Sequence, residues 1–405
     1  MFPTIQLQYS PDHLGDLRLR ENPAQKKYRL VRVPDRIVPQ RSLLDRQEAI
    51  SMPRRVLFFP LLLVVFRSLL GWSDPNQAVA QDSATFDPDG TAHITRTIPL
   101  PATISPEAQK WLASLAQSTA GPEALAERRK RTDEWRVKQS AEARRLFPVN
   151  VEETTTAGVR TDIITPPSTP LANNNLVLIN LHGGGFNSDS GSLIEGVPIA
   201  SLAKIKVVSV YYRLAPENPF PAPVDDTVAV YKALLKTYKP HNIGIFGTSA
   251  GAILTAEVAV RLKQLNLPEP AALGLFSVLT DFSHTTDSQQ LFTLNGFPGA
   301  LQPQDPNRKS AEEYAPKTDL KDPVLSPIFA DLKAMPPSLL VTSTRDLLLS
   351  DTTLFHRALL RAGDNSQLVV YEALPHAFWY HFQLPETQEA LQLMAKFFNE
   401  KVGRS

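Results

Sequence analysis

Residues 247–251 read Gly-Thr-Ser-Ala-Gly and place Ser249 between two glycines in a G-x-S-x-G pattern. The apolar segment 243–246 precedes this pattern and helical spacing follows at 250–265, so we expect a strand, a sharp turn and a helix. The glycines leave room for the turn, and the positive end of the helix dipole favours negative charge beside the serine. Ser249 is therefore the predicted nucleophile. The alternative is a glycine-rich turn without chemistry.

Residues 182–185 read His-Gly-Gly-Gly and follow the apolar segment 176–181. Acyl transfer needs backbone N–H donors close to an oxyanion, and glycine allows that close approach. The predicted donors of this oxyanion hole are the N–H groups of Gly183, Gly184 and Ala250, the residue after the nucleophile. A phosphate-binding loop is the alternative, but no G-x-x-x-x-G-K-[ST] pattern is present.

The general base should be a histidine that follows the acid, because chains with this kind of serine turn carry the partners in the order Ser, Asp or Glu, His. The histidines after Ser249 are His284, His356, His376 and His381. His376 directly follows a predicted strand at 368–371, on a loop at the carboxyl edge of the sheet, where such sites are built. It is the predicted base, and His381 is the alternative.

The acid should follow the preceding strand in the chain. Residues 338–341 form an apolar segment that leads through 342–345 to Asp346. Asp351 is better placed to begin the next helix. The predicted triad is Ser249, Asp346 and His376, in which the imidazole takes the serine proton and the carboxylate orients the imidazole.

Strands and helices alternate around these residues. After a hairpin at 149–153 and 159–165, predicted strands lie at 176–181, 207–212, 243–246, 272–276, 338–341 and 368–371. Predicted helices lie at 192–203, 224–238, 250–265, 351–362 and 386–400. Near-continuous apolar strands that alternate with helices indicate an α/β fold, with a mostly parallel sheet covered on both faces.

Two segments fall outside this alternation. Residues 106–146 have helical spacing, broken by a Gly-Pro pair at 121–122. Residues 282–335 hold several Pro and Asp residues and interrupt the order of strands and helices. We expect a helical cap built from about 100–148 and about 282–335, on a single domain that spans 81–405.

The N-terminal part contains the features of a secretory signal peptide. A basic start at 53–55 precedes an apolar run at 56–66 and a small-x-small end at 78–80. The apolar run is shorter than the roughly 20 residues of a spanning helix. We expect a signal peptide at 52–80 and a secreted or periplasmic protein without a stable membrane anchor in its mature form; a retained anchor or a buried helix is the alternative. Residues 1–51 are then a non-native upstream extension or a disordered leader.

Composition excludes several classes of function. The chain has 405 residues, no cysteine and a formal net charge of +1. The lack of cysteine excludes disulfides, thiolate metal sites and cysteine nucleophiles. The balanced charge gives no sign of a nucleic-acid partner. We predict no metal site.

The motifs also form an ordered set. They are His-Gly-Gly-Gly at 182–185, Tyr-Tyr-Arg-Leu-Ala-Pro-Glu at 211–217, Gly-Thr-Ser-Ala-Gly at 247–251, Arg-Asp-Leu-Leu-Leu-Ser-Asp at 345–351 and Pro-His-Ala-Phe at 375–378. This set resembles the motifs of the bacterial hormone-sensitive-lipase-like esterases. The resemblance implies an α/β-hydrolase fold with a helical cap, hydrolysis of carboxylic esters with short or medium acyl chains, and no cofactor. Thr248 and Leu347 depart from many members, which have an acidic residue and a proline there.

Other functions share this machinery. A lactonase, an amidase or a deacetylase would use the same triad. A non-catalytic small-molecule receptor on the same scaffold is a further alternative, although all three triad positions are filled here. The small-molecule partner is expected to be an ester. The sequence does not fix the oligomeric state, and it is compatible with a homodimer.

Overall fold

The chain divides into two compact units, Met1–Gln81 and Asp82–Ser405. The computed structural model describes residues 17–22, 27–32, 82–115, 123–299 and 306–404. In the first unit, β1 (Leu17–Asn22) and β2 (Lys27–Arg32) pair as an antiparallel hairpin. The predicted signal peptide at 52–80 lies outside the described residues. Within those residues, no helix combines the length and the apolar character that crossing a bilayer requires.

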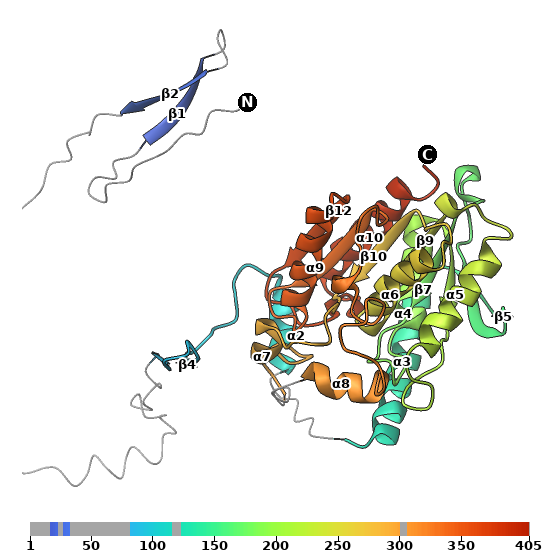
Figure 1. Cartoon of the computed structure of the whole chain (residues 1–405), viewed down its shortest axis with the longest axis horizontal. Helices are drawn as coiled ribbons and strands as arrows, with labels where there is room; N and C mark the ends of the chain where they lie inside the picture. Colours follow the sequence, from blue (N-terminus) through green and yellow to red (C-terminus); the bar gives the residue numbers. More distant parts are fainter. Residues whose placement is uncertain (1–16, 23–26, 33–81, 116–122, 300–305, 405) are drawn as a thin grey trace, which may run out of the picture. The chain divides into compact units, whose positions relative to one another are not determined.

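The second unit is built on an eight-stranded sheet (Figure 1). Its strands are β5 (Asn150–Thr156), β6 (Val159–Thr165), β7 (Val177–Leu181), β8 (Lys206–Val210), β9 (Ile243–Thr248), β10 (Ala272–Phe276), β11 (Ser338–Ser343) and β12 (Ser366–Tyr371). They lie in the order β12-β11-β10-β9-β7-β8-β6-β5. The pairs from β8 to β12 are parallel, whereas β6 pairs antiparallel with β8 and β5. The predicted α/β fold is confirmed.

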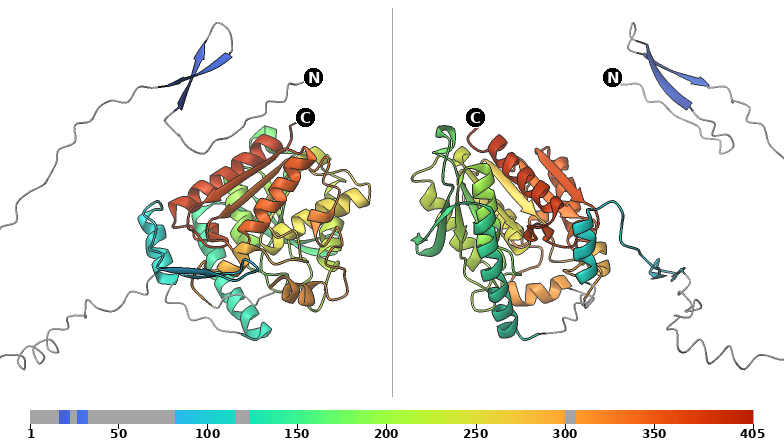
Figure 2. Two further views of the ribbon diagram at one scale, coloured as in Figure 1. Left: turned by 60° about the vertical axis from the view of Figure 1, so that its left-hand side comes forward. Right: turned by 180° about the vertical axis from the view of Figure 1, so that it is seen from behind.

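Helices cover both faces of the sheet (Figure 2). One face carries α4 (Ser192–Ala203) and α10 (Pro385–Lys401), backed by α2 (Pro106–Leu115) and α3 (Leu125–Leu146). The other face carries α5 (Ala222–Leu234), α6 (Ala250–Gln264) and α9 (Leu349–Ala362). These helices appear where the apolar spacing predicts them, and α2 and α3 are separate helices as the Gly-Pro pair requires.

The strands divide their side chains between two hydrophobic clusters. On β7, Val177, Ile179 and Leu181 pack with α5 and α6, whereas Leu178 faces the cluster of α4 and α10. Successive strand residues point to opposite faces, so a strand that is buried on both sides needs apolar residues throughout. The uninterrupted apolar runs in the sequence are therefore a direct consequence of this two-sided burial.

Some boundaries differ from the predicted ones. The sequence predicts β8 to reach residue 212, but the strand ends at Val210 and the Tyr211 N–H bonds to the carbonyl of Arg160 at 3.0 Å. Helix α5 ends at Leu234 rather than at 238, because the chain continues there as hydrogen-bonded turns. Outside the sheet, β3 (Ser83–Phe86) and β4 (Ala92–Thr95) form a separate hairpin. The 282–335 segment contains α7 (Asp287–Leu291) and α8 (Pro306–Tyr314).

Candidate active site

Ser249 stands at the turn between β9 and α6, with φ 58° and ψ −122°. A positive φ is uncommon for a residue with a side chain, and such backbone strain clusters at functional sites. The Ser249 N–H donates to the carbonyl oxygen of Phe276 on β10 at 2.9 Å, which holds the turn. The next N–H, that of Ala250, begins a helix and has no partner within it. The turn therefore presents a hydroxyl and a backbone donor together.

Packing against β7 explains both glycines of the motif. A Cβ at Gly247 would collide with the carbonyl oxygen of Leu181 and lie 2.5 Å from the carbonyl carbon of Gly251. A Cβ at Gly251 would collide with the same oxygen and lie 2.6 Å from the carbonyl carbon of Leu181. These obstacles are backbone atoms, so no side-chain rotation can relieve the contact. The close approach brings the serine turn against the end of β7, where the His-Gly-Gly-Gly loop begins.

Gly251→Ala is accordingly expected to destabilise the fold by at least the ~1–3 kcal/mol that overpacking typically costs. The measurement is the midpoint of urea or thermal unfolding. Gly158→Ala serves as the control, because nothing lies within 4 Å of its added Cβ and only its φ of +84° opposes the change. That control should cost about 1–2 kcal/mol. A Gly251→Ala protein as stable as the wild type would contradict the packing described for the turn.

Asp346 and His376 meet beyond the ends of the neighbouring strands β11 and β12. The Nδ1 atom of His376 lies 2.8 Å from Oδ1 of Asp346. Their side chains are only 6% and 1% exposed. Because Nδ1 faces the carboxylate, Nε2 is the ring nitrogen that remains for proton transfer. The structure brings these two predicted residues together in the relation that a base and its orienting acid require.

Further donors surround the Asp346 carboxylate. The Leu348 N–H donates to Oδ1 at 2.9 Å, the Thr342 hydroxyl donates to Oδ2 at 2.9 Å, and the Ser277 hydroxyl also donates to Oδ2. Burial alone would raise the pKa of Asp346, but His376 and these hydrogen bonds hold that pKa below its usual value. Asp346 is therefore a carboxylate at neutral pH, despite its burial.

The histidine loop packs against the serine turn. Trp379 follows His376 by three residues, and its Nε1 donates to Oγ1 of Thr248 at 3.0 Å. Thr248 directly precedes Ser249. Within the described residues no hydrogen bond joins the Ser249 hydroxyl to the imidazole of His376. In enzymes without bound substrate, the bond between nucleophile and base is often long or poorly aligned. The contact through Trp379 nevertheless ties the loop that carries the base to the turn that carries the serine.

The loop at 182–185 is held from both sides. The ring of His182 stacks on that of Tyr212 with centroids 4.1 Å apart, and the Tyr212 hydroxyl donates to the carbonyl oxygen of His182 at 2.6 Å. Gly184 has φ 116°, and its carbonyl oxygen accepts from the Ser188 N–H at 3.1 Å. Because β7 and β9 are neighbours in the sheet, this loop lies beside the serine turn. We call residues 182–185 the oxyanion loop.

The three glycines of the oxyanion loop differ in their surroundings. Burial raises the pKa of the Glu195 carboxyl group, and hydrogen bonds from Tyr380 and Asn180, together with the nearby Gly183 N–H, oppose that rise. No hydrogen bond is formed by the N–H groups of Gly183, Gly184 and Gly185 to other backbone groups in the described residues. Sequence reasoning selected Gly183 together with Gly184, and nothing in the motif distinguishes Gly183 from Gly185. No contact in the described residues tests the predicted donors Gly183, Gly184 and Ala250, and Gly185 is an equal alternative to Gly183.

A residue of α3 clamps the segment around the oxyanion loop. Arg129 donates to the carbonyl oxygens of Asn187 and Ala215, at 2.6 and 2.8 Å, and its guanidinium pairs with Glu217 at 2.7 Å. This hydrogen-bonded pair lowers the pKa of Glu217 to about 2. The sequence gives no local sign of the clamp, because Arg129 lies far from these residues in the chain. It ties the first predicted cap segment to residues that follow the oxyanion loop.

The second predicted cap segment contacts the residue that directly follows the oxyanion loop. The ring of Tyr314, at the end of α8, stacks on Phe186 with centroids 3.6 Å apart and an interplanar angle of 6°. The Tyr314 hydroxyl donates to the buried carboxyl of Glu257 on α6 at 2.7 Å. Segments from before and after the serine turn therefore both contact the residues that follow the glycines.

The arrangement matches that of a known family. A family profile described as "alpha/beta hydrolase fold" matches residues 178–380, half of the chain. The crystal structure of an esterase from the bacterial hormone-sensitive lipase (HSL) family superimposes with a TM-score of 0.62 at 27% identity, over 73% of this chain and 98% of that chain. The chain belongs to the hormone-sensitive-lipase-like family of α/β hydrolases.

Similarity to individual members extends over most of the second unit. An acetyl-hydrolase of Streptomyces hygroscopicus is 31% identical over 246 residues, which are 58% of this chain and 79% of that relative. An esterase of Acinetobacter venetianus is 31% identical over 267 residues, 62% of this chain and 84% of the relative. The crystal structure of esterase E25 gives a TM-score of 0.67 at 30% identity, over 76% and 98% of the two chains. The α/β hydrolase described here is an esterase of this family.

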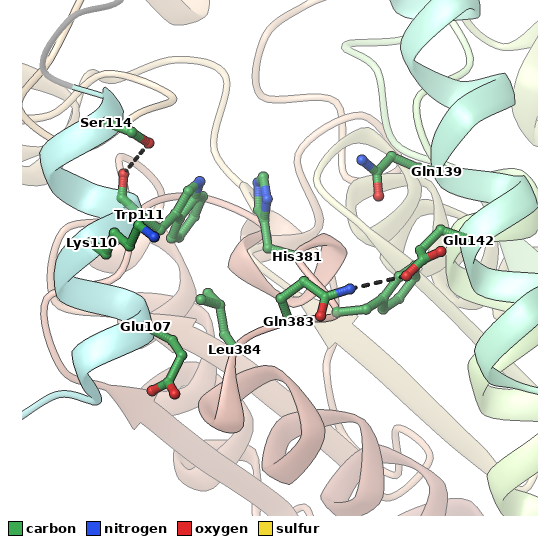
Figure 3. Close-up of a pocket in the computed structure, with 10 residues that line it drawn as sticks. Glu107, Lys110, Trp111, Ser114, Gln139, Glu142, His381, Gln383 and Leu384 are labelled. Carbon is green, nitrogen blue, oxygen red and sulfur yellow. Dashed lines mark hydrogen bonds between the residues drawn. The ribbon is translucent and has the colours of Figure 1, made fainter.

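The alternative base of this hydrolase lies in a different environment. His381 lines a pocket of about 480 Å³ between α2 and α3 (Figure 3). Its ring centroid is 4.0 Å from that of Trp111, and burial lowers its pKa to about 4. Within the described residues no carboxylate forms a hydrogen bond with the His381 ring. His381 therefore lacks the orienting acid that His376 has.

The two remaining histidines after Ser249 make only local contacts. His284 pairs with Asp281 at 3.3 Å near the surface, and His356 bonds to the Ser366 hydroxyl at 2.8 Å. In the part of the chain that the structure describes, no group of three or more His, Asp and Glu side chains could hold a metal ion.

Proposed function

We propose that this esterase hydrolyses carboxylic esters through a covalent acyl-enzyme, with Ser249 as nucleophile, His376 as base and Asp346 as orienting acid. The observation that carries the proposal is the 2.8 Å contact between His376 Nδ1 and Asp346 Oδ1, at the edge of the sheet that also bears the strained serine turn. A nucleophile, a base and a group that orients the base together are the signature of covalent catalysis.

In the first step, Ser249 Oγ attacks the ester carbonyl carbon while Nε2 of His376 takes the hydroxyl proton. The carbonyl oxygen becomes an oxyanion, which accepts hydrogen bonds from the N–H groups of Gly184, Gly185 and Ala250. The intermediate collapses, the bond to the alcohol oxygen breaks, and His376 gives its proton to the leaving alcohol. A water molecule, deprotonated by the same imidazole, then releases the carboxylic acid.

Esters of short and medium acyl chains are the proposed substrates. Two of the similar proteins are named acetyl-hydrolase and carboxylesterase, and crystals of a third, EstE5 (29% identical), were soaked with p-nitrophenyl butyrate. We further propose that the segments at about 100–148 and 282–335 form the cap that walls the acyl site. The contacts of Arg129 and Tyr314 beside the oxyanion loop support this role.

A panel of p-nitrophenyl esters from acetate to laurate, together with lactones and anilides, tests the proposal on the purified full-length chain. We expect kcat/KM to be highest for acetate to hexanoate and to fall about tenfold or more at laurate, since each misfitting methylene costs binding in a fixed pocket. Lactones or anilides that react faster than every ester would instead assign a lactonase or an amidase.

A covalent probe separates an enzyme from a receptor. A p-nitrophenyl phosphonate should inactivate the protein and leave one adduct on the peptide that contains Ser249, as identified by mass spectrometry. The expectation follows because only an activated serine attacks such a probe quickly. Absence of both turnover and adduct would favour a non-catalytic binding protein on the same scaffold.

A further inference from the structure

A buried carboxyl group lies behind the oxyanion loop, and the mechanism above does not use it. Glu195 stands in the first turn of α4, and only 4% of the residue is exposed. Taking a carboxyl group out of water is costly unless hydrogen bonds compensate. The groups that surround Glu195 must therefore offset that cost.

These groups come from several parts of the active site. The Tyr380 hydroxyl, on the loop that carries His376, donates to Oε1 of Glu195. The Asn180 side chain on β7 donates from Nδ2 to Oε2 at 3.1 Å. The Gly183 N–H and the Thr248 hydroxyl lie near enough to help lower the pKa of the carboxyl group. One carboxyl group thus contacts the oxyanion loop, the serine turn and the histidine loop.

The backbone leaves room for this arrangement. A Cβ at Gly191 would collide with Oε1 of Glu195 and lie 2.8 Å from the Tyr380 hydroxyl oxygen. A Cβ at Gly183 would lie 3.0 Å from the carbonyl oxygen of Thr248 and 3.4 Å from the Tyr380 hydroxyl oxygen. The Glu195–Tyr380 pair therefore packs directly against the back of the oxyanion loop.

We propose that Glu195 is a positioning residue of this esterase, whose carboxyl group fixes the Gly183 peptide so that the N–H groups of Gly184 and Gly185 face the oxyanion. The proposal rests on the proposed esterase function. The peptide whose N–H lies near Glu195 immediately precedes the two proposed donor peptides, so fixing its orientation restricts theirs. Backbone donors stabilise an oxyanion only where they are preorganised, and a shift of about 1 Å can cost about 100-fold in rate.

The charge of Glu195 agrees with this role. Burial raises its pKa to about 8, although hydrogen bonds from Tyr380 and Asn180 oppose the shift. At neutral pH the group is thus mostly the uncharged acid. Its oxygen atoms can still accept hydrogen bonds, while no negative charge stands behind a site where an oxyanion develops. A glutamine has the same shape and also carries a carbonyl oxygen that accepts hydrogen bonds. We therefore expect glutamine at position 195 to preserve this role.

The test compares Glu195→Gln with Glu195→Met, which has similar length but no oxygen acceptor. We expect Glu195→Gln to keep kcat within a few-fold of wild type. Glu195→Met should lower kcat about 10- to 100-fold with little change in KM, because the loss concerns the transition state. The affinity for an alkyl trifluoromethyl ketone, whose adduct carries the oxyanion, should fall in parallel with kcat. The assay substrate is the p-nitrophenyl ester that the wild-type, full-length protein hydrolyses best.

Tyr380→Phe is a milder variant, in case Glu195→Met does not fold. It removes one hydroxyl that donates to Glu195, and kcat should fall about tenfold. Tyr211→Phe is the matched control, because the Tyr211 hydroxyl donates at 2.5 Å to a different buried carboxyl group, Asp162 on β6. The control should keep kcat even where it lowers the unfolding midpoint.

The outcomes separate this role from the proposed function. If wild type hydrolyses no ester, the esterase proposal itself fails. A different outcome overturns only the role of Glu195. In that outcome the wild type is active, and both Tyr380→Phe and every folded Glu195 variant have the kcat and the ketone affinity of the wild type. A loss of kcat in Glu195→Gln as large as in Glu195→Met would also overturn it, because the acceptor is retained.

Discussion

Ser249→Ala is expected to lower kcat for ester hydrolysis by about 10⁶-fold and to leave the fold intact. The side-chain oxygen is the proposed attacking atom, and alanine supplies no replacement. The turn itself depends on the backbone, through the bond from the Ser249 N–H to Phe276 and the glycines on either side. Turnover of a p-nitrophenyl ester and the circular dichroism melting curve measure the two effects separately.

Ser140→Ala is the matched control for this variant. Ser140 lies on α3, is 8% exposed, and its hydroxyl has no hydrogen-bond partner among the described residues. Its replacement removes a buried serine oxygen that takes no part in the proposed proton transfers or oxyanion contacts, so kcat should not change. Wild-type turnover by Ser249→Ala would show that another group is the nucleophile, and the covalent mechanism would have to be abandoned.

Much of the fold can be predicted from the sequence because burial on both faces of the sheet leaves uninterrupted apolar runs. The run at 176–181 becomes β7 (Val177–Leu181), and the helical spacing at 250–265 becomes α6 (Ala250–Gln264). Asp346 and His376 could be selected for the same reason. Each follows the end of a recognisable strand, and parallel strands bring such loops to one edge of the sheet.

What the sequence does not reveal is which distant groups hold these residues. Glu195 reads as one more acidic residue in the first turn of a helix, and its partner Tyr380 lies 185 positions further along the chain. Likewise, Ser277 donates to Asp346 across 69 positions. The choice between Gly183 and Gly185 depends on where the Glu195 carboxyl lies, and no local pattern encodes that position.

Asp346→Asn should lower kcat about 10³- to 10⁴-fold near neutral pH, with the protein still folded. The donors around the carboxylate predict how the amide will sit. The Leu348 N–H can only donate, so the amide oxygen should take the Oδ1 position and still accept from His376, while the amide nitrogen faces the Ser277 and Thr342 hydroxyls, which can reverse and accept. The imidazole then keeps its orientation but loses the negative charge that stabilises its protonated form.

Asp351→Asn is the control that makes this result specific. Asp351 lies five residues further on, is 1% exposed, and accepts from the Thr286 hydroxyl at 2.7 Å rather than from an imidazole. Burial raises its pKa to about 7, so an uncharged asparagine resembles a state that the carboxyl group already populates. We expect kcat of Asp351→Asn to stay within a few-fold of wild type when both variants are assayed with the same ester. The reverse result, with Asp346→Asn active and Asp351→Asn inactive, would overturn the assignment of Asp346 as the orienting acid.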